Sequence, residues 1–113
     1  MTFDLKFFDN PEEAPRPAED VRITRVRADP LPDGRRVAVS IALTPFLKKP
    51  SLDVVLLRDG VEARSLSIIE SIEYEMQVTL HLPQTDPDGA YTVRVDLLSE
   101  TGILQSETAA FSV

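Results

Sequence analysis

The chain has no cysteine, no tryptophan and a single histidine, and glycine is scarce, with four residues in 113. Without cysteine it can form neither a disulfide nor a thiolate metal site, and one histidine cannot complete a structural zinc site. The glycines are isolated from one another, so the chain has no glycine-rich loop that could cradle a phosphate group. We therefore expect no metal and no cofactor.

Long hydrophobic runs are also missing. The longest aliphatic run, 54–57, is far shorter than the roughly 20 residues that a membrane-spanning helix needs. Asp4, Lys6 and Asp9 interrupt the N-terminal segment, which therefore lacks the unbroken apolar stretch of a signal peptide. These features predict a soluble, cytoplasmic protein without a membrane partner. An extracellular location applies only if the chain is a piece of a longer protein.

Charge is unevenly distributed along the chain, whose formal net charge is −7. Residues 1–20 carry a net −4, residues 21–50 a net +5 and residues 51–113 a net −8. Because an acidic protein repels phosphate backbones, we do not expect nucleic-acid binding. The basic stretch is interpreted as a solvated face that pairs with the acidic part of the same domain.

A period of two dominates the sequence after residue 20. The clearest example is 72–82, where apolar and polar residues alternate as they do in a half-buried strand. Asp-Gly pairs, which favour tight hairpin turns, separate such runs at Asp33, Asp59 and Asp88. No run of ten or more residues has helical periodicity, which argues against parallel βαβ folds. Strands are expected at 21–28, 35–44, 52–58, 61–67, 72–82, 91–97 and 103–113.

Seven short strands with turns about every 8–12 residues are typical of an all-β sandwich. The run Asp88-Gly89-Ala90-Tyr91-Thr92-Val93 resembles the start of strand F in immunoglobulin-like domains, in particular bacterial and fibronectin type III-like modules. The resemblance implies a seven-stranded antiparallel immunoglobulin-like sandwich over residues 21–113, in which Tyr91 forms a tyrosine corner with nearby backbone. Val93 stands where antibody domains have their second cysteine, so only the sandwich architecture carries over.

The resemblance leaves two sheet arrangements open. The Asp59-Gly60 hairpin favours the fibronectin-like sheets A-B-E and G-F-C-C′, because a tight turn keeps the 61–67 strand beside the 52–58 strand. If the 61–67 strand crosses to the other sheet, the constant-type immunoglobulin arrangement results. In the first strand the alternation slips at Thr24-Arg25, which predicts a β-bulge or an edge strand.

The residue types that carry catalysis do not form a recognisable set. His81 shares the polar face of its strand with Glu73 and Glu75, but the sequence has no Gly-x-Ser-x-Gly motif that could supply a nucleophilic serine. The two glutamates are interpreted as solvated surface charges. The segment 86–89 has some of the spacing of a calcium loop. The bidentate glutamate that such a loop requires would fall on Val95, so the segment is interpreted as a turn. We expect no enzymatic activity.

Two segments carry more apolar side chains than a tail or a loop needs. The first is the arm of residues 1–8, which an acidic, proline-rich connector of residues 9–20 joins to the domain. The arm docks either on its own domain as an extra edge strand, which we prefer, or on a second copy to give a homodimer. The second is the loop between Pro45 and Pro50, whose apolar residues either contact a partner or cap the core. The candidate contact residues are Phe3, Leu5, Phe7, Phe8, Phe46, Leu47, Lys48 and Lys49.

A sandwich without a catalytic set predicts a non-enzymatic protein-interaction or structural module. Its partner would be another protein or its own copy, and no small-molecule substrate is evident. The alternative is a carbohydrate-binding or adhesion module of an extracellular assembly. Such modules use rows of exposed aromatic rings, whereas this chain has two tyrosines and no tryptophan.

Overall fold

The computed structural model describes residues 21–47, 49–69 and 73–113, and these residues form seven β-strands. Each strand corresponds to one expected from the sequence, with ends that differ by at most three residues. None of the described residues forms a helix long and apolar enough to cross a membrane. The strands are β1 (Ile23–Pro30), β2 (Arg36–Leu43), β3 (Ser51–Arg58), β4 (Val61–Ile68), β5 (Glu75–His81), β6 (Ala90–Ser99) and β7 (Gly102–Ser112).

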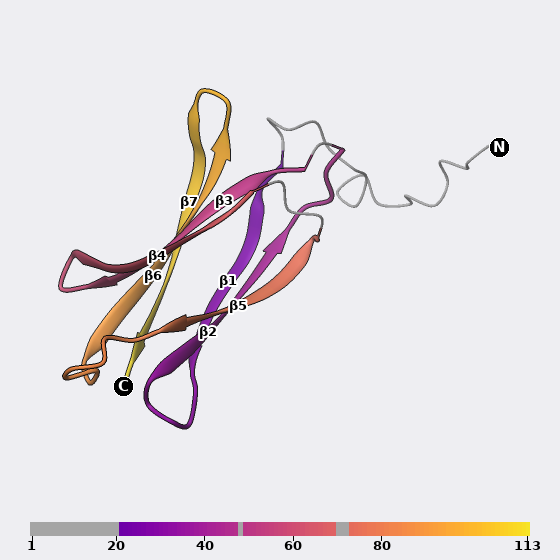
Figure 1. The fold of residues 1–113 in the computed structure, drawn as a ribbon. Helices are drawn as coiled ribbons and strands as arrows, with labels where there is room; N and C mark the ends of the chain where they lie inside the picture. Colours follow the sequence, from indigo (N-terminus) through magenta and orange to yellow (C-terminus); the bar gives the residue numbers. More distant parts are fainter. Residues whose placement is uncertain (1–20, 48, 70–72) are drawn as a thin grey trace.

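The strands form two antiparallel sheets, with the orders β1-β2-β5 and β4-β3-β6-β7. Figure 1 shows β1, β2 and β5 in one layer and the other four strands in the second. This is the fibronectin-like arrangement favoured by the sequence. The Asp59-Gly60 turn keeps β4 beside β3, since both residues have the positive φ angles (54° and 79°) that suit a tight hairpin.

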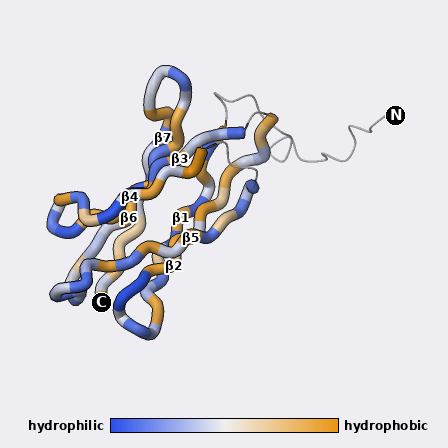
Figure 2. The backbone as a smooth tube through the Cα atoms, in the orientation of Figure 1, coloured by the Kyte–Doolittle hydropathy of each residue, from blue (hydrophilic) through white to orange (hydrophobic). Residues whose placement is uncertain are grey.

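The core lies between the two sheets and is built from alternate residues of the central strands. On β2, Val37, Val39 and Ile41 are completely buried, as their shared face in the sequence predicts. Figure 2 shows hydrophobic residues alternating with polar ones along these strands. The completely buried side chains are Val21, Val37, Val39, Ile41, Leu52, Val54, Leu56, Val93, Val95 and Leu97.

The strand with the clearest alternation, β5, is less buried than its pattern suggests. It begins at Glu75, and of the residues expected inside, Met76 and Val78 are only half-buried. Tyr74, just before the strand, is 44% exposed, and Ile72 lies outside the described residues. The reason is position: β5 is an edge of the smaller sheet, so its inner face has cover on one side only.

One long side of the sandwich is closed by a glutamine. The predicted bulge in β1 is confirmed, because the pairing with β2 shifts between Ile23 and Arg25. The Ile23 N–H donates to Gln105 Oε1 of β7 at 2.7 Å, and Gln105 Nε2 donates to the Ile23 carbonyl at 3.1 Å. The Gln105 amide therefore satisfies the backbone N–H and carbonyl of Ile23, as a neighbouring strand would, and links the edge of one sheet to the edge of the other.

The β1–β2 turn is held by Asp33. The Arg35 N–H donates to Asp33 Oδ1 at 2.9 Å, and Arg36 Nε donates to Asp33 Oδ2 at 2.8 Å. The backbone N–H, and after it the guanidinium, lower the pKa of Asp33 below its usual value, because both favour the charged carboxylate.

A lowered folded-state pKa means that Asp33 stabilises the fold at a pH above the usual carboxyl pKa, and that this contribution is lost as the pH falls through the folded-state value. We expect Asp33→Asn to lower the free energy of unfolding at pH 6, and the gap from wild type to narrow towards pH 2. Urea unfolding of both proteins across this range checks the prediction. A gap that widens on acidification would contradict it.

Candidate interaction site

Three connections lie at one end of the sandwich: the described residues of 44–50 and of 69–74, and residues 99–102. The pairing places the start of β3 beside the ends of β4 and β6, through Leu52–Ile68 and Ser51–Leu98. The end of β2 lies there too, because the Leu43 N–H donates to the Tyr74 carbonyl at 2.7 Å. Loops clustered at one end of a sandwich are where this architecture often contacts partners.

Phe46 caps the core at this end. It is half-buried, packs against the core cluster and meets the Tyr74 ring edge-on, with centroids 4.7 Å apart and an interplanar angle of 86°. Edge-to-face rings of this kind add about 0.5–1.5 kcal/mol beyond the area they bury. Pro45 and the buried Pro50 restrict the backbone at the two ends of the loop, and the ring contact anchors Phe46 between them. Together they limit the movement of the backbone at Leu47.

Leu47 itself is 72% exposed. Of the two possibilities for the loop, Phe46 therefore follows the capping one, whereas Leu47 caps nothing. Lys49 is exposed beside it, and Lys48 lies outside the described residues.

Further apolar side chains are exposed on the neighbouring connections. Six large apolar side chains are exposed in the described part of the chain, and four of them belong to this end, which indicates a bias rather than scatter. We call these four the loop-end residues. They are Leu47, Ile69, Tyr74 and Ile103.

The candidate residues of the N-terminal arm, Phe3, Leu5, Phe7 and Phe8, lie outside the described residues.

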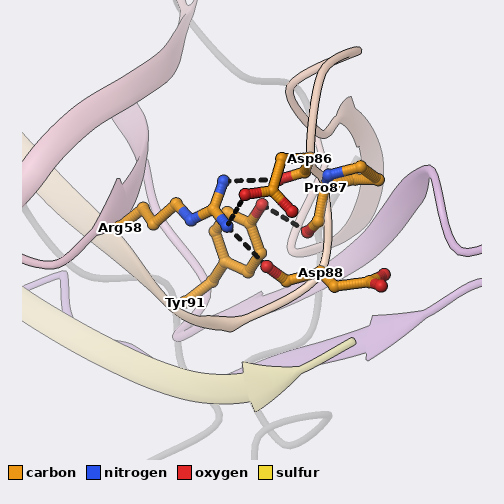
Figure 3. Close-up of polar contacts among 5 residues, drawn as sticks. All are labelled: Arg58, Asp86, Pro87, Asp88 and Tyr91. Atoms are coloured by element: carbon orange, nitrogen blue, oxygen red, sulfur yellow. Dashed lines mark hydrogen bonds and ion pairs between the residues drawn. The ribbon is translucent and has the colours of Figure 1, made fainter.

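At the opposite end, Arg58 holds the turn before β6 (Figure 3). Its Nη1 donates to the Asp86 carbonyl at 2.7 Å and its Nη2 to the Asp88 carbonyl at 2.5 Å, while the Asp86 carboxylate lies 3.8 Å from Nη2. The guanidinium carbon is 5.3 Å from the centre of the Tyr91 ring. Gly89 is needed beside it, because its φ is 144° and a Cβ would come within 3.2 Å of Nη2.

The tyrosine corner implied by the resemblance is present. Tyr91, 2% exposed, donates its hydroxyl to the Pro87 carbonyl at 2.5 Å and stacks on Phe111 with centroids 5.2 Å apart. Three consecutive carbonyls, 86 to 88, thus accept from Arg58 or Tyr91. The segment is therefore a fastened turn, as interpreted from the sequence. The sequence alone did not indicate the role of Arg58 in this turn, because only strand pairing places Arg58 opposite Tyr91, 33 residues further along the chain.

His81 is the last residue of β5. It is exposed and lines an open hollow of about 490 Å³, and the lining residues that the structure describes include two arginines and no acid. Glu73 and Glu75 are exposed, and Glu75 lies 3.9 Å from Arg25, as expected of surface charges. The hollow is lined by Arg35, Arg64, His81, Leu82, Pro83, Gln84 and Thr85.

Comparison with known proteins supports the fold. A solved structure described as an FN3tt mutant matches with a TM-score of 0.54 and 15% identity, over 80% of this chain and 91% of that chain. The Bifidobacterium dentium beta-glucuronidase complexed with coumarin-3-O-glucuronide matches with a TM-score of 0.48 and 15% identity, over 82% of this chain and 17% of that chain, a likeness too low to carry an argument. No family model and no curated protein matches. The chain therefore has an all-β sandwich fold like that of fibronectin type III domains.

Proposed function

We propose that this chain is a non-enzymatic protein-interaction module that binds its partner through the loop-end residues. The observation that carries the proposal is Leu47, which stays 72% exposed although Phe46 beside it is anchored on the core and on Tyr74. A large apolar side chain held in water on a stiffened loop is costly to leave unpartnered, and a protein surface with a matching pocket removes that cost.

The local chemistry favours a protein over a carbohydrate. A sugar-binding face offers flat exposed aromatic rings, but Tyr91 is buried and the Tyr74 ring is partly covered by Phe46. Aliphatic side chains such as Leu47, Ile69 and Ile103 suit an apolar pocket on a protein instead.

The test compares Leu47→Asp with Val61→Asp. Val61 is the matched control, since it is 68% exposed and begins β4 at the other end of the sandwich. Both variants should unfold within about 0.5 kcal/mol of wild type, because both change exposed side chains. A photo-crosslinking residue at position 47 and another at 61 would identify the partner, whose affinity for each variant is then measured with purified proteins by calorimetry.

We expect Leu47→Asp to weaken binding about ten-fold or more, as for a central contact residue, and Val61→Asp to leave it within about two-fold of wild type. Equal affinities for all three proteins, or crosslinking at position 61 and none at 47, would overturn the proposal.

A further inference from the structure

Along one long side of the sandwich, the described residues only partly cover the apolar interior. On this side β4 extends past the edge of the smaller sheet. Two of its residues, Ile68 and Leu66, pair with the completely buried Leu52 and Val54 of β3 and therefore lie on the inward face of the sheet. Leu66 is nevertheless 38% exposed and Ile68 is half-buried. Across the gap, Met76 and Val78 of β5 are also half-buried, so both sheets leave apolar side chains partly in water along this side.

Among the strands that the structure describes, none pairs with the outer edge of β4. This strand pairs with β3 on one side and ends the larger sheet on the other, so the backbone groups on its outer side face away from the sheet. An eight-residue edge of this kind is a template for another strand, and proteins usually cover it or disrupt it. The edge at the far end of the same sheet, β7, is instead tied to β1 through Gln105.

We propose that residues 3–9 of the same chain pair with β4 as an antiparallel fifth strand of the larger sheet. In this segment Phe3, Leu5, Phe7 and Asp9 alternate with polar or outward residues, so they share one face of an extended strand. An antiparallel register that sets Leu5 opposite Ile68 also sets Phe7 opposite Leu66 and Asp9 opposite Arg64.

That register matches both apolarity and charge. Leu5 and Phe7 would cover the half-buried Ile68 and the exposed part of Leu66, on the side of β4 where no other described strand lies. Asp9 comes to Arg64, which lines the open hollow together with Arg35 and His81. Since no acid lines the hollow within the described residues, its positive field favours the carboxylates of Asp9 and of the connector that follows.

The connector is long enough for the arm to bind its own domain. The twelve steps from Asp9 to Val21 span up to about 40 Å when extended. A strand added beyond β4 lies four strand spacings from β7, about 19 Å, and the sheets are about 10 Å apart. The connector holds the arm near this site at an effective concentration of roughly millimolar. This concentration favours docking within one chain over exchange between two chains.

The experiment uses the absence of native cysteine. In the full-length protein, Phe7→Cys with Leu66→Cys tests the proposed pair, and Phe7→Cys with Thr108→Cys is the control on the exposed face of β7. Under a mild oxidant we expect the first pair to form an intramolecular disulfide at least ten-fold faster than the second, because opposed residues of paired strands have Cβ atoms about 4.5–5.5 Å apart. Non-reducing electrophoresis and peptide mass spectrometry identify the bond.

A charge exchange in the same double-cysteine protein tests the register. Asp9→Arg or Arg64→Asp alone should slow disulfide formation roughly two- to five-fold, and the two together should restore the rate. Equal rates for the two cysteine pairs would overturn docking on β4, and a disulfide formed between two chains would overturn docking within one chain. Neither outcome depends on the loop-end residues, so the result stands apart from the proposed function.

Discussion

Replacing Tyr91 by alanine should lower the free energy of unfolding by about 3–5 kcal/mol, the usual cost of emptying a buried aromatic site. The ring is 2% exposed and stacks on Phe111, and its hydroxyl fastens the turn before β6. Urea unfolding followed by circular dichroism measures the change. If the alanine variant is too unstable to purify, Tyr91→Phe carries the test.

Tyr91→Phe keeps the ring and removes only the hydrogen bond to the Pro87 carbonyl, so we expect a loss of about 1 kcal/mol. Tyr74→Phe is the matched control: the residue is 44% exposed, and the variant should stay within about 0.5 kcal/mol of wild type. A Tyr91→Phe protein as stable as wild type would show that the tyrosine corner contributes no stability here.

Arg58→Ala is the second substitution expected to have a large effect, with a loss of about 1.5–2 kcal/mol. Its guanidinium donates to two carbonyls, lies against Tyr91 and is only 26% exposed, and hydrogen bonds from a charged donor contribute more than neutral ones. We expect no more than this loss, although a hydrogen bond to a charged group can contribute about 3 kcal/mol, because water can hydrate the carbonyls of the turn once the side chain is removed. Chemical denaturation measures it, with the exposed Arg64→Ala as control.

Two further variants separate charge from geometry. Arg58→Lys keeps the charge but cannot reach both carbonyls, so it should recover less than half of the loss. In a double-mutant cycle with Tyr91→Phe we expect a coupling of about 0.5–1 kcal/mol, because both side chains hold the same turn. Full recovery by lysine, or strict additivity with Tyr91→Phe, would contradict the view that the two residues act as one clamp.

Much of the fold was predictable from local patterns. Period-two alternation, the continuous apolar run at 54–57 and the turn residues between them located the seven strands. The Asp59-Gly60 turn favoured the fibronectin-like sheet order that the structure has, because a tight hairpin tends to keep two strands side by side. The slip at Thr24-Arg25 marked the bulge in β1. These features depend on residues close together in the sequence, where sterics and side-chain direction decide the outcome.

The candidate site was predictable only in part. The Pro45–Pro50 loop stood out as apolar and stiff, but the sequence could not assign Phe46 to the core and Leu47 to the solvent. That choice depends on Tyr74, which strand pairing brings to the loop from 28 residues away. Likewise, the half-buried state of Met76 follows from its strand being an edge, a property of the sheet order and not of the alternation.

By itself, the sequence determined the strands, their turns, the core-facing side of strands with clear alternation such as β2, and the exclusion of disulfides and thiolate metal sites. Only the tertiary structure decided which distant residues meet: Arg58 with the turn before β6, Gln105 with the bulge in β1, and Arg35, Arg64 and His81 around one hollow. The physical reason is that alternation and turn chemistry act over a few residues, whereas these contacts depend on strand register and sheet order, which bring together segments up to 82 residues apart.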